Sequence, residues 1–391
     1  MKLSPAIFSF SRRAAFWLAG LLGAGVLVFA CLAAGMYFWL LPNISSYRDT
    51  VAVLMSSALG QRVTLEAVSG KWQQARPEIS LRGVRLFDQQ NRPALYLEQL
   101  EASFAWRSLL FLEPRFNRLE LAGSALAVRR ARDGHYYVGG IPINPADPNS
   151  DFSDWLLKQG TVHVSRATLA WQDEVRGAPA LILRDVDFTL ENLFHRHQAQ
   201  LRATPPADLA TPVAFEADLT GRSLRDIKTW SGHIQGSLAG VEIPKLSNWI
   251  DLPYPIDRGW GAANVRLDVA KGLITGISAG LNVRDVSATL GVSLPPLQFA
   301  RLRGSLGWQQ LGAKQRVEVN GLSLTLPGGS AIGAFDASFG WEGKTREGQA
   351  RNLDLAVVQS LLPALPVPQA VRQTTLDLQP QGRIDEMQLG F

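Results

Sequence analysis

A Gly-x-Ser-x-Gly run at residues 276–280 is the most direct candidate for catalysis in this chain of 391 residues. In a nucleophile elbow, such a run exposes a reactive serine, here Ser278, between a strand and a helix. The residues that follow, Leu281 to Val286, instead alternate apolar and polar side chains, which is typical of a strand. We therefore interpret residues 276–280 as a turn between strands. An envelope hydrolase is the least favoured of three functional hypotheses.

Histidines and neighbouring carboxylates are the other candidates for chemistry. His195 and His197 would share one face of a strand and could bind a metal, but the sequence nearby offers no cysteine and no obvious third ligand. We interpret them as part of a polar face or a loop. Two carboxylate pairs, Asp173-Glu174 and Asp185-x-Asp187, are interpreted as solvated residues of a turn and of a polar strand face. The sequence thus predicts no catalytic, cofactor-binding or metal-binding residue and no enzymatic activity.

The chain is organised around an uncharged apolar segment, residues 14–41. As a helix it would be about 42 Å long, more than the roughly 30 Å of a hydrocarbon core. Lys2, Arg12 and Arg13 precede it, and no charged residue follows before Arg48. The positive-inside rule predicts cytoplasmic residues 1–13, a single transmembrane anchor at 14–41, and a body outside the cytoplasm. A cleaved signal peptide or a lipoprotein signal is less favoured, because this segment is nearly twice as long as their apolar regions.

Composition limits what the body can be. The net charge is +5, but residues 1–41 carry three basic and no acidic side chains, so the body is nearly neutral and nucleic-acid binding is not supported. The single cysteine, Cys31, lies in the predicted anchor, so the body has no disulfide. Thirty-five glycines and a period of two from Arg62 onward predict a turn-rich, mainly β body.

One apolar pattern recurs along the body, with its period of two displaced by one residue in the middle. The motif occurs as Ile79-x-Leu81-x-x-Val84-x-Leu86, Leu181-x-Leu183-x-x-Val186-x-Phe188, Leu281-x-Val283-x-x-Val286 and Val317-x-Val319-x-x-Leu322-x-Leu324. The residue pairs at the displacement are Arg82-Gly83, Arg184-Asp185, Arg284-Asp285 and Asn320-Gly321, and Ser165-Arg166 fits the same pattern. In a regular strand, one extra residue would move every later side chain to the other face. To keep the apolar residues on one face, the strand needs a β-bulge or kink at each pair, and we expect one there.

Several shorter elements divide the body. Residues 42–60 predict a short amphipathic helix that lies on the bilayer or, as we favour, plugs the first end of the sheet. Residues 61–140 predict a first β-groove segment that contains a hairpin at Asp133-Gly134. Residues 141–160 predict a loop and a short helix, and residues 161–391 continue the β-groove, with another short helix opened by Pro244.

The order of these elements resembles a known family. The span, the helix ending in Leu59-Gly60, Val68-Ser69-Gly70-Lys71-Trp72, the segment from Pro77 to Leu86 and the Asp133-Gly134 hairpin resemble the N-terminal part of YhdP-type proteins of the AsmA-like superfamily. The resemblance implies an inner-membrane-anchored periplasmic protein of a Gram-negative envelope. It also implies an elongated, curled, groove-like antiparallel β-sheet, with an apolar inside that carries phospholipid between inner and outer membranes.

Such proteins are usually longer and end in a helical segment that meets the outer membrane. Here Leu376-x-Leu378 and Met387-x-Leu389 are still strand-like at the last residue, so we expect the chain to stop in mid-sheet, as a fragment or as a chain completed by a partner. Roughly 20 to 25 strands, stacked about 4.8 Å apart, would give a groove of about 100 to 120 Å.

The apolar strand faces outnumber the helices that could cover them, which favours an open groove over a closed sandwich. The residues predicted to line the groove are Leu81, Val84, Leu86, Leu183, Val186, Phe188, Val283, Val286, Val319, Leu322 and Leu324. The first functional hypothesis is a groove that shields phospholipid acyl chains. The alternative is an anchored β-scaffold whose open sheet edge assists assembly of outer-membrane or other envelope proteins.

Overall fold

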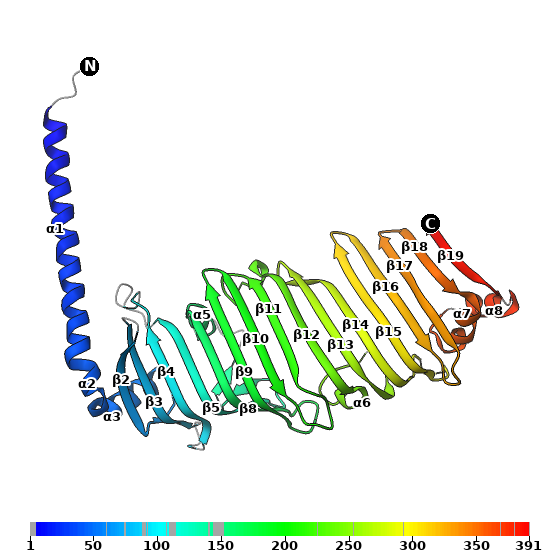
Figure 1. Cartoon of the computed structure of the whole chain (residues 1–391), viewed down its shortest axis with the longest axis horizontal. Coiled ribbons are helices and arrows are strands. Elements are labelled where there is room, and N and C mark those ends of the chain that lie inside the picture. Colours follow the sequence, from blue (N-terminus) through cyan, green and yellow to red (C-terminus); the bar gives the residue numbers. More distant parts are fainter. Residues whose placement is uncertain are drawn as a thin grey trace.

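The computed structural model describes residues 5–390, except residues 60, 74–75, 88–90, 92, 107, 109–114, 140, 144–151, 225, 253, 292, 368 and 379. The predicted helix end at Gly60, and residues 144–151 of the predicted loop and short helix, fall outside the described residues. A long helix leads into an extended, curled sheet whose strands are stacked in nearly chain order (Figure 1).

The N-terminal helix is longer than the predicted anchor. It begins as α1 (Pro5–Gly35) and continues without a gap through the π-helical turn η1 (Met36–Leu40), α2 (Leu41–Asn43), the 3-10 turn η2 (Ile44–Tyr47) and α3 (Arg48–Leu59). Within it, Ala19–Ser57 is long and apolar enough to cross a membrane. The predicted anchor and the predicted amphipathic helix are therefore parts of one helical segment, which turns where α2 and α3 pass beneath the first strands (Figure 1).

In the described part of the chain, all strands belong to one sheet. Their bounds are β1 (Val63–Thr64), β2 (Ala67–Gln73), β3 (Arg76–Phe87), β4 (Pro93–Phe104), β5 (Phe116–Arg130), β6 (Tyr136–Val138), β7 (Ile141–Ile143), β8 (Thr161–Asp173), β9 (Leu181–Leu193), β10 (Arg196–Thr204), β11 (Val213–Thr220), β12 (Ser231–Glu242), β13 (Ile256–Ala270), β14 (Leu273–Ala288), β15 (Leu297–Leu311), β16 (Lys314–Thr325), β17 (Ala331–Glu342), β18 (Thr345–Asp354) and β19 (Arg383–Gly390). The predicted mainly β fold, with a long N-terminal helix and few short helices, is confirmed.

One strand pair departs from the antiparallel pattern. β5 and β8 are parallel, with Leu121 opposite Val164. The predicted hairpin at Asp133-Gly134 does join β5 to β6, but β6, β7 and the helix α5 (Phe152–Leu157) then return the chain to the end of the sheet where β5 began. A connection of this length is what a parallel pair needs.

The stacked strands are fewer than expected. From β2 to β19, without the short strands β6 and β7, spacing of about 4.8 Å gives a groove of roughly 70 Å instead of the expected 100 to 120 Å. In Figure 1 this long axis runs away from α1 at a wide angle.

The predicted bulges are present. The second residue of each displaced pair has a positive φ: Gly83 (60°), Arg166 (52°), Asp185 (48°), Asp285 (52°) and Gly321 (57°). The strand registers shift or skip a residue at these points, as between Val164 and Ala167 and between Val319 and Leu322. The left-handed residue takes up the extra position, so the apolar side chains before and after it stay on one face.

Short helices pack on the apolar face. Val51, Ala52 and Met55 of α3 cover a core over β1 to β4, and Trp155 and Leu156 of α5 cover another over β5, β8 and β9. Leu246 of the helix α6 (Ile243–Leu246) and Trp249 pack against a buried cluster of Leu209, Ala210 and Val241.

The described C-terminal part contains helices that the sequence interpretation missed. α7 (Leu355–Leu361), the 3-10 turn η4 (Leu362–Ala364) and α8 (Gln369–Leu378) lie between β18 and β19. The prediction of a strand at Leu376-x-Leu378 is therefore wrong. A carboxylate caps the start of α7: Asp354 accepts a hydrogen bond from the Ala356 amide (3.0 Å), which stabilises the first turn of this helix.

Candidate functional site: an apolar groove

Two rows of apolar residues cross the sheet from β2 to β19, with one residue of each row on every strand except β6 and β7. The strand registers place the members of each row side by side. The first row is Val68, Leu81, Leu100, Leu121, Val164, Phe188, Leu201, Phe215, Gly236, Val265, Ala279, Leu306, Val319, Ala337, Ala350 and Met387. The second is Gly70, Ile79, Ala102, Leu119, Val162, Leu190, Ala199, Ala217, Ile234, Leu267, Ile277, Trp308, Val317, Phe339, Gly348 and Leu389.

The row between these two points to the opposite face, because successive side chains of a strand alternate. With the exception of Gly307 it is entirely polar: Ser69, Ser80, Glu101, Glu120, His163, Thr189, Gln200, Glu216, Gln235, Arg266, Ser278, Gly307, Glu318, Ser338, Gln349 and Gln388. The sheet thus has one apolar face and one polar face along its whole described length.

The apolar face is open over the later strands. Ile277, Leu306, Val317 and Phe339 lie next to one another on β14 to β17 and are 39%, 41%, 38% and 44% exposed. Large apolar side chains of a soluble domain normally pack against a second layer. Here the sheet is curled and no second layer of the described chain covers these four side chains. This part of the apolar face is therefore an open apolar groove.

The eleven residues predicted to line a groove all lie on the apolar face, but they differ in exposure. Leu81, Val84 and Leu86 are at most 5% exposed and pack beneath α3, so they form a closed core. Val186, Val286 and Leu324 are also buried, whereas Leu183, Phe188, Val283, Val319 and Leu322 are half-buried. The sequence analysis missed Ile277, Leu306 and Phe339. It selected residues from the motif with the displaced period, and these three lie in regularly alternating strand segments outside that motif.

The candidate catalytic serine lies on the polar face. Ser278 is in the middle of β14, opposite Arg266 on one side and Gly307 on the other. The interpretation of residues 276–280 as a turn is therefore wrong, and the run is also not a strand-to-helix elbow. Its glycines are strand residues.

The two histidines do not share a face. His195 is exposed in the β9–β10 turn, whereas His197 is buried at one end of the apolar face. The Nδ1 atom of His197 lies 2.7 Å from the Asn192 Oδ1 atom, its Nε2 atom lies 3.2 Å from the Gly221 carbonyl, and its ring stacks on Trp230. Burial lowers the pKa of His197 below its usual 6.5, and this outweighs the Gly221 carbonyl, which favours the charged ring.

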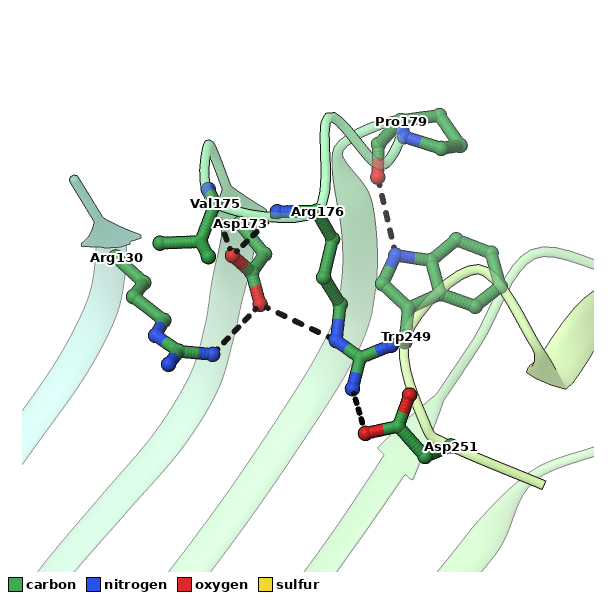
Figure 2. A network of polar contacts seen from close by, with 7 residues as sticks. All are labelled: Arg130, Asp173, Val175, Arg176, Pro179, Trp249 and Asp251. Carbon is green, nitrogen blue, oxygen red and sulfur yellow. Dashed lines mark hydrogen bonds and ion pairs between the residues drawn. The ribbon is translucent and has the colours of Figure 1, made fainter. Parts of the chain in front are cut away.

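Asp173 holds the turn between β8 and β9. Its Oδ1 atom accepts hydrogen bonds from the amides of Val175 (3.0 Å) and Arg176 (3.2 Å), and the side chain is buried (Figure 2). Arg176 also pairs with Asp251 (2.6 Å), which ties this turn to the segment after α6. The placement of Asp173-Glu174 at a turn is confirmed, but Asp173 is a buried structural residue and is not solvated.

The first strands of the sheet are joined to the long helix by apolar and aromatic contacts. Leu41 packs against Gly70, where a Cβ atom would collide with it. Toward the N-terminus, Tyr37 of η1 contacts Trp72, and Phe29 of α1 contacts Trp106 of the β4–β5 connection, with ring centroids 5.4 Å and 5.0 Å apart. The first strands of the sheet therefore lie beside the last turns of the apolar helix.

A long apolar helix and an open, curled sheet with one apolar face are the arrangement that the resemblance implies. The family model described as YhdP protein matches residues 1–391. The chain belongs to the YhdP family. Its placement in the AsmA-like superfamily is consistent with this match. No curated protein and no solved structure matches the chain.

For this member of the YhdP family, the main feature that the described residues bring together is an apolar surface. The groove residues are aliphatic and aromatic, and at one end of the apolar face His197 and Asn192 are hydrogen-bonded to each other. The arrangement can exclude water from apolar chains.

Proposed function

We propose that this protein is anchored in the inner membrane by α1 and carries phospholipid along a periplasmic β-groove, between the inner and outer membranes. The single observation that supports this most is the pair of uninterrupted apolar rows, which remain open to solvent on β14 to β17. The three basic residues before the apolar segment support the orientation, with the body outside the cytoplasm. The protein then acts by shielding cargo and not by catalysis.

The physical argument concerns the acyl chains. Each CH₂ group moved from water to an apolar surface contributes about 0.8 kcal/mol. A groove with an apolar residue on every strand offers similar contacts at each step, so a chain that moves from one strand to the next does not have to enter water. The headgroup would remain in solvent at the mouth of the groove.

Position-specific photocrosslinking tests this proposal. A photoreactive residue at Leu306 or Val317, on the apolar face, should form abundant phospholipid adducts in membranes. A matched residue at Gln309, on the polar face of the same strand as Leu306, should form few. Equal adduct yields on the two faces would contradict the groove assignment.

A charged substitution gives the functional readout. Val186→Asp would place a charge in a packed part of the sheet, because Val186 is 5% exposed, and its effect would mix folding with lipid binding. Leu306→Asp changes an exposed groove position and should remove lipid adducts at Val317 without preventing folding. Gln309→Asp should leave the adducts unchanged. An unchanged adduct yield in Leu306→Asp would contradict the proposal.

A further inference from the structure

The apolar face is covered over the first strands and opens at β10. In the second apolar row, Ala102, Leu119, Val162 and Leu190 of β4 to β9 are at most 9% exposed and belong to the core beneath α5. From Ala199 on β10 onward, every residue of this row is half-buried or exposed. The strands before β10 therefore offer no open groove, and a lipid from the membrane would have to enter at β10 or beyond.

A hollow of about 970 Å³ lies at this point, beside α5 at one edge of the sheet (Figure 1). It extends from Trp106, after β4, to His197 at the start of β10 and Arg222 after β11. His197 is on the same face as Ala199 and Leu201, because side chains two residues apart on a strand share a face. The hollow therefore reaches the apolar face where the groove opens, and its volume is within the range of ligand sites.

The other end of the hollow lies next to the long helix. Trp106 contacts Phe29 of α1 and also Trp72, with ring centroids 5.0 Å and 5.7 Å away. With α1 as the anchor, a hydrocarbon core of about 30 Å that begins after Arg13 spans about 20 residues, so Phe29 lies near its outer boundary. Tryptophan is enriched at that boundary. The hollow thus connects the outer leaflet of this membrane with the open groove.

The hollow carries an excess of positive charge. Arg76, Lys158 and Arg222 line it, and none of the three forms an ion pair with another described residue. Among the described lining residues Asp154 is the only carboxylate, and both of its oxygens accept hydrogen bonds from the Ser223 hydroxyl (2.8 and 2.9 Å). Arginine and lysine side chains are the usual protein ligands of phosphate groups.

Exposed apolar side chains lie beside these cations. Leu193 and Phe194 line the hollow at the β9–β10 turn and are 67% and 79% exposed. Phe194 has a φ of 55°, a left-handed conformation that hairpin turns usually give to glycine, asparagine or aspartate. A free phosphate ion would need only the cations. Cations together with an exposed apolar lip match a phospholipid, which has a phosphate and acyl chains.

We propose that phospholipid passes between the inner membrane and the groove through this hollow. Arg76, Lys158 and Arg222 bind its phosphate, and its acyl chains pass over Leu193 and Phe194 to reach β10. This inference rests on the proposed function and deepens it, because it names the entry site and the headgroup chemistry that the site selects. A phosphate is required, and no particular group attached to the phosphate is.

Photocrosslinking at two positions of the full chain in native membranes tests this proposal. A photoreactive residue at Leu157 reports lipid in the hollow, and one at Leu306 reports lipid in the open groove. Both should form phospholipid adducts in the otherwise wild-type chain. Arg76→Glu/Lys158→Glu/Arg222→Glu should lower both yields about tenfold, because the lost charge-assisted contacts weaken binding of the phosphate.

Two matched variants separate the phosphate site from a general effect of charge or folding. Arg184→Glu/Arg258→Glu/Lys344→Glu reverses three exposed cations outside the hollow and should leave both yields unchanged. Arg76→Lys/Arg222→Lys keeps the charges of the hollow and should retain most of the adducts. Equal losses in the two charge-reversal variants, or undiminished adducts at 157 when the hollow is reversed, would overturn the proposal.

The purified full chain in nanodiscs identifies the bound chemistry. Photoreactive phosphatidylglycerol should label a reporter cysteine-free chain at the hollow about tenfold more than diacylglycerol with the same acyl chains, which lacks the phosphate. Excess inorganic phosphate should leave this labelling in place. Equal labelling by the two lipids would reject a phosphate site. Loss of labelling in inorganic phosphate would assign the hollow to the free ion and not to a lipid.

The two reporter positions also separate this proposal from the proposed function. Adducts at 306 without adducts at 157 would reject entry through the hollow and leave the groove assignment intact. Adducts at 157 without adducts at 306 would support the hollow and contradict carriage along the groove. The absence of adducts at both positions would reject both.

Discussion

The Phe215 ring lies over Gly236 on the neighbouring strand, in the space that a side chain at 236 would occupy. Gly236 is the only glycine in the first apolar row, and the ring fills the gap that its missing side chain would leave. The row is therefore continuous by packing even where its sequence lacks an apolar side chain. The relationship also makes Gly236 a sensitive position for perturbing the groove.

Gly236→Val should displace the Phe215 ring and cost about 1 to 3 kcal/mol of unfolding free energy, as overpacked positions do. Chemical unfolding of the full chain in detergent measures the cost. Gly280→Val is the matched control on the polar face, because a Cβ atom there meets nothing closer than 4.0 Å. A cost at Gly280 equal to that at Gly236 would show that strand glycines, and not the ring, determine the result.

Substitutions at Asp185 test whether the bulge requires a left-handed backbone at this position. Its φ of 48° is unfavourable for a residue with a Cβ atom and most unfavourable for a β-branched one. Asp185→Gly should be neutral or stabilise the fold by up to about 1 kcal/mol, whereas Asp185→Val should destabilise it by about 1 to 2 kcal/mol. Asp187→Val, two residues away on the same strand, is the control and should cost less. Equal costs at 185 and 187 would argue against a conformational requirement at the bulge.

The bulges also show how far the sequence predicts this fold. The displaced motif predicted a bulge or kink at each of five residue pairs, because a strand cannot otherwise keep its apolar residues on one face. The structure places the second residue of each pair, at 83, 166, 185, 285 and 321, in the left-handed region. The parallel pairing of β5 and β8 was not predictable in the same way. It depends on where the chain returns after β6 and β7, and no local pattern encodes that return.

The groove was only partly predictable. Alternation identified which side chains share a face, but it could not show that α3 covers Leu81, Val84 and Leu86 while Leu306 and Phe339 stay open. Whether a helix covers a strand face depends on residues far apart in sequence. An apolar face has the same period of two whether it is covered or open. The contact between Phe29 and Trp106 is likewise between residues far apart in sequence.

Asp173 should be important for the stability of the turn between β8 and β9. Asp173→Ala removes an acceptor from two backbone amides and a partner from Arg130 and Arg176, so it should cost about 1 to 3 kcal/mol. Glu174→Ala removes a single, partly exposed pair with Arg129 and should cost under about 1 kcal/mol. Thermal unfolding compares the two variants. A larger loss in Glu174→Ala would contradict the role given to Asp173.

His197 should make the fold sensitive to mild acid. Its folded-state pKa is lowered by burial, so its contribution to stability is complete above the unfolded value of 6.5 and is lost as the pH falls through the folded value. Asp218 does not titrate in this range, because Arg196 lowers its pKa to about 2. Wild-type stability should therefore fall between pH 7 and pH 5 more than that of His197→Gln. A wild type that gains stability on acidification would show that the two oxygen acceptors, and not burial, dominate.

The most direct test of the central claim asks whether lipid moves along the apolar rows. Val265→Asp places a charge in the first row between β10 and β15, and Arg266→Asp places one on the polar face of the same strand. Photocrosslinking is then measured at Leu201, on the anchor side of the block, and at Leu306, beyond it. The account predicts that Val265→Asp preserves lipid adducts at 201 and removes most of those at 306, whereas Arg266→Asp changes neither. Undiminished adducts at 306 in Val265→Asp would contradict a continuous groove.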